Sequence, residues 1–334
     1  MRPKATVMIP TYNQARWLSE AIESALAQDL DGLEVVVGDD ASTDGTPEVI
    51  ARYAADPRLK VVRQPRNLGR VGNYRSLLYG HATGGWVLNL DGDDTLTDPS
   101  YLRTALDEAQ RHPRAVLAVG GVCSSHLDGP PRDRLPTEFD WQVVEGADYF
   151  LNWKPSTLVP HLACLYRRPL AVSLGFYRSD ILFSDGESLR RLVLHGQVLL
   201  CGRVVGRWRT HAANASWAVS AALHIANLEL IMGPFRHALA RGLDPRRLEA
   251  WKKANLREYG VLVVHRCLDQ EACGQALLFL RHLWRSHPRA FWEVTAELVL
   301  SGRPLVKLLL LALGGRDLLA AARARWHRVK LEAR

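Results

Sequence analysis

Asp91, Asp93 and Asp94 place three carboxylates within four residues of the chain. They directly follow the apolar run Trp86–Leu88, so we expect a strand to deliver all three to one place. At neutral pH such carboxylates repel one another unless a cation offsets their charge. Oxygen ligands suit Mg²⁺ or Mn²⁺, which proteins usually hold through one or two carboxylates and the phosphates of a nucleotide. The pattern therefore predicts a metal-assisted site for an anionic substrate, although a polar turn after a strand would use the same residue types.

The segments around these carboxylates predict strands that alternate with helices. Helices are expected after Trp17, after the Thr46–Pro47 start signal, and over residues 71–79. The predicted strands are the apolar runs 7–9, 35–37, 59–62 and 86–88. Such alternation implies a parallel sheet, which binds ligands at the carboxyl ends of its strands. We therefore expect the polar loops that follow these strands to form one site.

Five short motifs occur in a fixed order over about 90 residues. They are Pro10–Asn13, Asp39–Thr46, Asn67–Gly69, Ala82–Gly84 and Leu90–Asp94. In this order and spacing the chain resembles the family 2 glycosyltransferases, which are inverting, nucleotide-sugar-dependent enzymes of the GT-A fold. The resemblance covers the first hundred residues well, continues more loosely to about residue 215, and then fades.

The resemblance implies an α/β fold of GT-A type, with a Rossmann-like, mostly parallel sheet flanked by helices. This glycosyltransferase domain would span residues 1–215, with a nucleotide-sugar-binding half over about 1–100 and an acceptor half over about 101–215. Residues 216–334 are expected to form a helical C-terminal region. Its predicted helices cover 223–239, 248–268, 275–284 and 291–300.

The resemblance also assigns a donor-binding set: Pro10, Tyr12, Asp40, Asn67, Arg70, Asp91 and Asp93. The first two loops of the family hold the nucleotide base and ribose, and an aromatic ring and a carboxylate suit that task. Asp40 could instead cap the following helix, and we expect Asp44 to be mainly a turn residue. Arg66 and Arg70 could assist at the diphosphate or could be solvated loop charges.

Mn²⁺ or Mg²⁺ is the implied cofactor, with Asp93, Asp94 and His211 as its predicted ligands. A divalent ion would stabilise the charge that develops on the leaving nucleoside diphosphate. His211 falls in a predicted loop over 207–216, after a predicted strand over 197–205. A neutral imidazole can bind a metal or contact a diphosphate, but most lone histidines are structural.

Asp185 is the predicted general base, because inverting transfer needs a group that removes the proton of the acceptor hydroxyl. The segment 183–192 resembles the family segment that carries the catalytic carboxylate before a helix. Ser184 stands where the family commonly has an acidic residue, so Glu187 remains a second candidate for the base. Asp185 could also be only the N-cap of that helix.

Charge is concentrated at the C-terminal end of the chain. Residues 301–334 contain eight Lys or Arg and two acidic residues, and so carry most of the formal net charge of +8. Leucines interleave with these basic residues, which favours docking on an anionic membrane surface. Packing against the chain's own domain or in a homo-oligomer explains the pattern equally well. No recognition motif supports nucleic acid binding.

Composition supports a cytoplasmic protein, peripheral at the cytoplasmic membrane face if the basic end docks there. No signal peptide or apolar run of membrane-spanning length is visible, and the five cysteines show no metal-ligand spacing. A Gly-rich turn does not follow the first strand, which makes a dinucleotide-dependent oxidoreductase a poor match.

The predicted activity is a metal-dependent, inverting hexosyltransferase reaction. A sugar would pass from a nucleotide diphosphate donor, with UDP-sugars preferred, to a hydroxyl of a glycan, lipid-linked or small-molecule acceptor. Polysaccharide biosynthesis is the process that this chemistry suggests. The alternative is a catalytically silent nucleotide-sugar-binding or scaffolding protein of the same fold, because Ser184 departs from the family pattern.

Overall fold

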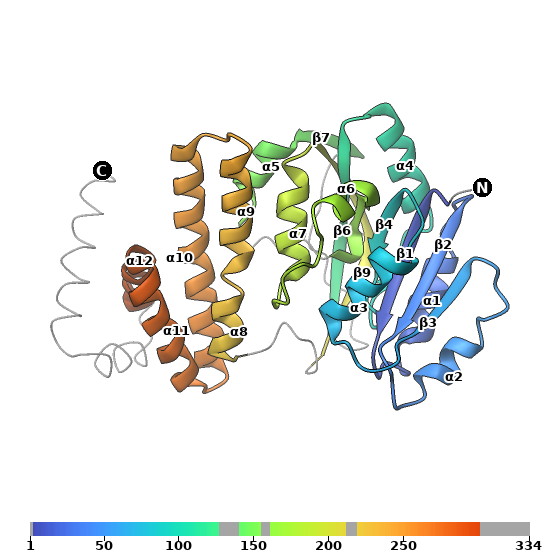
Figure 1. Cartoon of the computed structure of the whole chain (residues 1–334), viewed down its shortest axis with the longest axis horizontal. Helices are drawn as coiled ribbons and strands as arrows, with labels where there is room; N and C mark the ends of the chain where they lie inside the picture. Colours follow the sequence, from blue (N-terminus) through green and yellow to red (C-terminus); the bar gives the residue numbers. More distant parts are fainter. Residues whose placement is uncertain (1–2, 127–139, 155–160, 212–218, 301–334) are drawn as a thin grey trace. The chain divides into compact units, whose positions relative to one another are not determined.

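The computed structural model describes residues 3–126, 140–154, 161–211 and 219–300 (Figure 1). The chain divides into two compact units. The first comprises Met1–Asn152 and Leu158–Asn214, and the second comprises Trp153–Thr157 and Ala215–Arg334.

Over the residues that the structure describes, a mixed sheet of nine strands forms the centre of the first unit. Its order is β3-β2-β1-β4-β8-β6-β9-β5, with β7 paired to β9. The strands are β1 (Ala5–Thr11), β2 (Leu33–Asp39), β3 (Leu59–Arg63), β4 (Trp86–Asn89), β5 (Thr95–Leu96), β6 (Ala115–His126), β7 (Trp141–Glu145), β8 (Cys164–Arg167) and β9 (Gln197–Thr210). The four strands predicted from the apolar runs are confirmed and are mutually parallel. β8 runs antiparallel to both β4 and β6, so the second half of the sheet is mixed.

Helices flank this sheet. They are α1 (Leu18–Leu26), α2 (Thr46–Ala51), α3 (Arg70–Ser76), α4 (Tyr101–Arg111), α5 (Gly146–Asn152), α6 (Arg168–Ser173) and α7 (Ser184–Val193), with a π-helical turn η1 (Leu77–His81) and a 3₁₀ turn η2 (His161–Ala163). The apolar face predicted for α1 is buried at Leu18, Ala21, Ile22 and Ala25, which confirms the periodicity. The helix predicted over 71–79 begins as α3 but widens into η1 before β4.

The carboxyl ends of β1, β2 and β4 meet at one edge of the sheet, as predicted. Thr11 at the end of β1 pairs in register with Asp39 at the end of β2, and Met8 of β1 pairs with Asn89 of β4. All seven residues of β1 and of β2 are buried, so neighbouring layers fix the position of these strand ends. The polar loops that follow therefore start from a rigid edge.

One of the five motifs, Ala82–Gly84, lies at the opposite edge and fastens the sheet. Thr83 donates to the buried carboxylate of Glu34 from its backbone N–H at 2.8 Å and from its hydroxyl at 2.9 Å. The Gly84 N–H donates to the Thr6 hydroxyl at 2.9 Å. This motif thus joins the start of β4 to β1 and β2, away from the carboxyl ends.

The second unit is helical over residues 219–300. Its helices are α8 (Ala221–Ala226), α9 (Glu229–Ala240), α10 (Pro245–Asp269), α11 (Cys273–Ser286) and α12 (Pro288–Leu300). The single helix predicted over 223–239 is wrong, because Asn227 and Leu228 separate α8 from α9. The Asn227 amide turns inward and donates to the Tyr259 hydroxyl at 2.8 Å, which fixes the turn. The other three predicted helices are confirmed.

The basic end at 301–334 lies outside the described residues. Within the part of the chain that the structure describes, no helix is both long and apolar enough to cross a membrane.

Gly84→Ala should destabilise the first unit. A Cβ there would lie 2.6 Å from the Thr6 nitrogen and 2.7 Å from the Ala5 carbonyl carbon, and backbone cannot move aside cheaply. We expect a loss of about 1–3 kcal/mol, which lowers the midpoint of thermal unfolding by several degrees. Gly85→Ala is the matched control, since its Cβ would meet only the Lys4 carbonyl oxygen at 3.5 Å. Equal midpoints for the two variants would contradict this packing argument.

Candidate active site

The acidic loop Asp91–Asp94 continues the line of β4 alongside the carboxyl end of β1. The Leu90 N–H donates to the Met8 carbonyl at 2.9 Å, and the Gly92 N–H donates to the Pro10 carbonyl at 3.3 Å. A Cβ at Gly92 would lie 2.6 Å from Gln14 Oε1 and 2.9 Å from the Thr11 hydroxyl, so glycine lets the acidic loop approach the end of β1 this closely. The spacing of the three carboxylates therefore depends on the glycine between them.

Asp91 is held by groups that favour its ionised form. Its Oδ1 accepts from the Tyr74 hydroxyl at 2.8 Å, and its Oδ2 lies 3.1 Å from His161 Nε2. Burial acts to raise the pKa of Asp91, but the neighbouring His161 and Arg70 charges and these hydrogen bonds bring it below its ordinary value. Burial likewise acts to lower the pKa of His161, and the adjacent Asp91 carboxylate outweighs it and raises that pKa.

Asp93 and Asp94 are crowded and face β9. Arg209 Nη1 donates to the Asp93 carbonyl at 2.9 Å, and the Arg209 N–H donates to Asp94 Oδ1 at 2.8 Å. Burial and the Asp91 charge raise the pKa of Asp93, and burial with the Asp93 and Asp91 charges raises that of Asp94 well above its usual range.

The segment 207–210 belongs to β9, so the loop predicted from residue 207 is wrong over these four residues. β9 pairs with β6 as far as the His126–Thr210 pair, and it therefore extends to the acidic loop.

His211 follows β9 directly and contacts the acidic loop. Its Nε2 lies 2.8 Å from Asp93 Oδ2, and its ring stacks on Trp17 with centroids 4.6 Å apart. Among the described residues, no three or more His, Cys, Asp or Glu side chains are gathered as ligands of one ion. The donor set nevertheless fits a divalent ion, because Asp93 and Asp94 are buried, mutually repelling carboxylates and an imidazole adjoins one of them.

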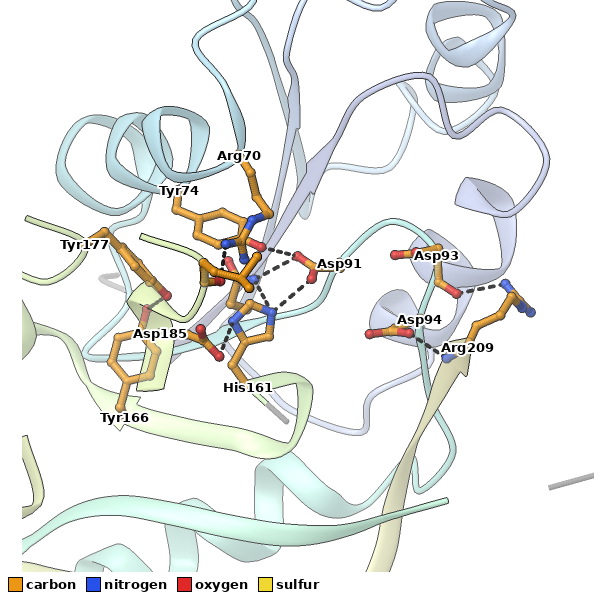
Figure 2. Close-up of polar contacts among 12 residues, drawn as sticks. Arg70, Tyr74, Asp91, Asp93, Asp94, His161, Tyr166, Tyr177, Asp185 and Arg209 are labelled. Carbon is orange, nitrogen blue, oxygen red and sulfur yellow. Dashed lines mark hydrogen bonds and ion pairs between the residues drawn. The ribbon is translucent and has the colours of Figure 1, made fainter. Parts of the chain in front are cut away.

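Asp185 lies in the first turn of α7 and approaches Asp91 through a shared neighbour. Figure 2 shows the His161 ring between the two carboxylates, with Nε2 3.1 Å from Asp91 Oδ2 and Nδ1 3.7 Å from Asp185 Oδ2. Phe183 holds the N-cap position of α7, so Asp185 is not its N-cap residue. The Asp185 side chain is 19% exposed, which leaves its carboxylate accessible to a substrate.

Glu187, the second candidate for the base, is engaged elsewhere. Its side chain is 1% exposed and forms ion pairs with Arg191 at 2.8 Å and with Arg178 at 3.1 Å. Arg191 also donates to the carbonyls of Leu174 and Gly175, so the pair anchors α7 to the segment before it. Glu187 therefore supports the helix that presents Asp185.

The predicted nucleotide-binding loops meet as expected, although several side chains also hold the loops together. The Asp40 N–H donates to the Thr11 carbonyl at 2.9 Å, and Asp40 Oδ1 accepts from the Leu68 N–H at 2.7 Å. Burial raises the pKa of Asp40 despite hydrogen bonds from the Leu68 and Gly69 amides. Tyr12 is 45% exposed at the end of the first loop, where its ring is available for stacking.

Two of the predicted donor residues differ in environment. Asn67 Oδ1 accepts from the Gly69 N–H at 2.8 Å, which closes the turn before α3. Arg70 is not a solvated loop charge: its guanidinium lies 5.5 Å from the Tyr74 ring centroid and donates to the Leu182 carbonyl. Burial acts to lower the pKa of Arg70, but Tyr74, Asp185 and Asp91 raise it above its ordinary value. Arg66 is exposed.

Three further residues shape this site that the sequence motifs do not indicate: Tyr74, His161 and Arg209. Tyr74 looks like an ordinary apolar-face residue of α3, and its hydroxyl reaches Asp91 only in the folded unit. His161 is distant in sequence from every motif, and Arg209 reaches the acidic loop because β9 extends to Thr210, beyond the predicted strand 197–205.

A family model for Glycosyl transferase family 2 matches residues 6–172, which is half of the chain. The chain belongs to glycosyl transferase family 2. The family predicted from the five motifs is thereby confirmed. The matched region contains the four parallel strands that lead to the site and both Asp91 and His161.

Two relatives of this glycosyltransferase family member illustrate the extent of the similarity. The succinoglycan biosynthesis protein ExoO of Rhizobium meliloti is 40% identical over 127 residues, which are 38% of this chain and 35% of that protein. An uncharacterized protein of Mycobacterium tuberculosis is 33% identical over 205 residues, which are 60% of this chain and 57% of that protein. The matches therefore span between about a third and just over half of these relatives' lengths.

Solved structures confirm the GT-A fold class. Residues 1–349 of Staphylococcus aureus TarS, in complex with UDP-GlcNAc, superpose with a TM-score of 0.70 at 18% identity, covering 97% of this chain and 92% of that one. The mannosyltransferase PcManGT of Pyrobaculum calidifontis, in complex with GDP-Man and Mn²⁺, gives a TM-score of 0.54 at 20% identity, covering 97% and 87%.

Glu187→Gln should lower stability far more than Asp185→Asn. Loss of the Glu187 charge leaves the guanidinium of Arg191 buried beside a neutral amide, at a cost of about 3–5 kcal/mol. Asp185 is partly exposed and anchors no helix, so its amide variant should change stability by about 1 kcal/mol or less. Urea unfolding followed by tryptophan fluorescence measures both. A Glu187→Gln variant as stable as the wild type would contradict the anchoring role.

Proposed function

We propose that this protein transfers a sugar from a nucleotide diphosphate donor to an acceptor hydroxyl, with inversion and with Asp185 as the general base. One observation carries the proposal: His161 lies between Asp91, of the predicted donor loop, and Asp185, of the acceptor half. The two carboxylates come from segments more than 90 residues apart and converge on one imidazole (Figure 2). Donor binding and proton removal need this proximity, because the acceptor must attack the donor carbon that Asp91 helps to position.

The donor would bind along the loops that follow β1, β2 and β4. The exposed ring of Tyr12 would stack on the base, next to Pro10, and Asp40 with Asn67 would shape the pocket for base and ribose. Asp91 would accept hydrogen bonds from the ribose or sugar hydroxyls, since its ionised form is favoured. Arg70 would supply positive charge toward the diphosphate.

The transfer itself forms one bond and breaks one bond at the anomeric carbon. The acceptor oxygen attacks this carbon from the face opposite the diphosphate, and Asp185 takes the proton of the acceptor hydroxyl. The bond between the anomeric carbon and the phosphate oxygen breaks, and its electron pair leaves with the nucleoside diphosphate. Attack from the opposite face inverts the anomeric configuration.

Mn²⁺ or Mg²⁺ is part of the proposal. Asp93, Asp94 and His211 would hold the ion, with Asp93 as the central ligand because its carboxylate already contacts His211. When bound, a divalent ion stabilises the negative charge of the leaving diphosphate. Carboxylate and imidazole donors together suit Mn²⁺ at least as well as Mg²⁺.

A UDP-sugar is the proposed donor, because uridine is the commonest base in the family that the motifs resemble. The TarS structure contains UDP-GlcNAc and the PcManGT structure contains GDP-Man, so GDP and dTDP donors belong in any test.

A glycan, lipid-linked or small-molecule hydroxyl would accept the sugar. The similarity to a succinoglycan biosynthesis protein supports a role in polysaccharide biosynthesis, where the basic C-terminal end would bring the enzyme to a membrane surface or a second copy.

A nucleotide-sugar-binding scaffold without turnover is the second candidate. Ser184 supports it, since this residue is 1% exposed and stands where the family commonly has an acid. Slow, metal-dependent hydrolysis of any donor by the wild-type chain would argue for the enzyme. Donor binding without any turnover would argue for the scaffold.

Asp185→Asn should abolish transfer and leave donor binding intact. The amide keeps the size of the side chain but cannot take a proton, so we expect the rate to fall by about 100-fold or more. The dissociation constant for the nucleoside diphosphate, measured by calorimetry, should stay within about twofold, because Asp185 does not form the predicted donor loops. Asp180→Asn is the matched control, an exposed carboxylate in the same segment. Full activity of Asp185→Asn would remove Asp185 from the mechanism.

A further inference from the structure

His161 offers each of its two ring nitrogens to a different carboxylate. Nε2 lies 3.1 Å from Asp91 Oδ2, and Nδ1 lies 3.7 Å from Asp185 Oδ2. Asn89 Nδ2 also lies 3.1 Å from Nε2, but an amide nitrogen can only donate. Since a carboxylate is the stronger acceptor, Nε2–H donates to Asp91, and the Asn89 amide donates to Asp91 Oδ1 at 3.3 Å.

The surroundings of His161 fix the ring in this orientation. The side chain is 8% exposed and contacts the Tyr74 ring edge-on, with centroids 5.5 Å apart. Its turn η2 leads directly into β8, and the Tyr101 hydroxyl donates to the Ala163 carbonyl at 2.6 Å, which holds the backbone of that turn. Because the His161 ring is buried and its backbone turn is held in place, a single ring position sets its distances to both Asp91 and Asp185.

We infer that His161 is a positioning residue whose two nitrogens have separable tasks, with Nε2 orienting Asp91 for the donor and Nδ1 orienting Asp185 for proton removal. This inference rests on the proposed function and adds to it a residue that none of the motifs contains. Among the described residues Nδ1 has no hydrogen-bond partner, and the carboxylate that it faces, at 3.7 Å, is that of Asp185. With Nε2–H donated to Asp91, Nδ1 attracts Asp185 through its own N–H, so the ring acts as the imidazolium, the form that both carboxylates favour. An apolar side chain of the same size could not donate a hydrogen bond to either carboxylate.

Two conservative substitutions divide these tasks. The amide nitrogen of Gln reaches the place of Nε2, so His161→Gln should keep the bond to Asp91 and lose the contact with Asp185. The shorter Asn places its amide near Nδ1, so His161→Asn should keep the contact with Asp185 and lose the bond to Asp91. A purely structural role for His161 would not distinguish the two variants in this way.

The test measures donor affinity and turnover separately for wild type, His161→Gln and His161→Asn. Affinity is the dissociation constant of UDP or GDP with Mn²⁺, by calorimetry, and turnover is the rate of hydrolysis of UDP-Glc, UDP-GlcNAc or GDP-Man at saturation. His161→Gln should keep its dissociation constant within about threefold and lose turnover by about 100-fold. His161→Asn should weaken binding by about tenfold and lose turnover less than His161→Gln does.

Controls separate the ways in which this inference can fail. His112→Gln alters another His–carboxylate pair of the first unit, with Nε2 3.2 Å from Glu108, and should change neither quantity. Thermal unfolding verifies that each variant is folded. Parallel losses of affinity and turnover in both His161 variants, or wild-type values in both, would overturn the inference and leave the proposed function standing. A wild-type chain that binds no diphosphate and hydrolyses no donor would overturn the proposed function and this inference together.

Discussion

Mutual repulsion among Asp91, Asp93 and Asp94 is the constraint on which the rest of the site depends. The end of β4 brings Asp93 and Asp94 into a buried setting beside the partly exposed Asp91, where burial and neighbouring carboxylate charges raise the pKa of both. Protein groups on two sides of the acidic loop offset this repulsion. Tyr74 and His161 contact the first carboxylate, as Figure 2 shows, and β9 with the residue that follows it meets the other two. A divalent ion bound with an anionic donor would complete the compensation.

This arrangement explains why the mixed half of the sheet matters to the function. The parallel strands β1, β2 and β4 lead to the loops of the proposed donor site, and they contact the acidic loop through backbone bonds from β1 and through Asn89 of β4. β8 pairs with β4 and follows η2, so it brings His161 beside Asp91. β9 carries Arg209 and His211 to the far side of the same loop. Segments far apart in the sequence thus supply the groups that offset the charge of the acidic loop.

The sequence predicted the parts of the fold that rest on local pattern. Apolar runs identified β1 to β4, and the ordered motifs identified the family, because both signals lie within short segments. The position of His161 beside Asp91 could not be predicted, since it arises from the antiparallel pairing of β8 with β4, which no local pattern encodes. The break at Asn227 was missed because its cause is a hydrogen bond to the hydroxyl of Tyr259, which lies on a different helix, α10. The resemblance ranked Asp185 ahead of Glu187 as the base, but the ion pair that engages Glu187 depends on its burial against the Arg191 guanidinium, which no motif encodes.

The central claim is that the acidic loop binds a nucleoside diphosphate with the help of a divalent ion. Calorimetric titration of the wild-type chain with UDP, GDP, CDP and dTDP, each with and without Mn²⁺, tests it most directly. We expect one of these diphosphates to bind and Mn²⁺ to tighten its binding. Binding of none of them under either condition, or equal binding with and without Mn²⁺, would rule out a metal-assisted diphosphate site at the acidic loop.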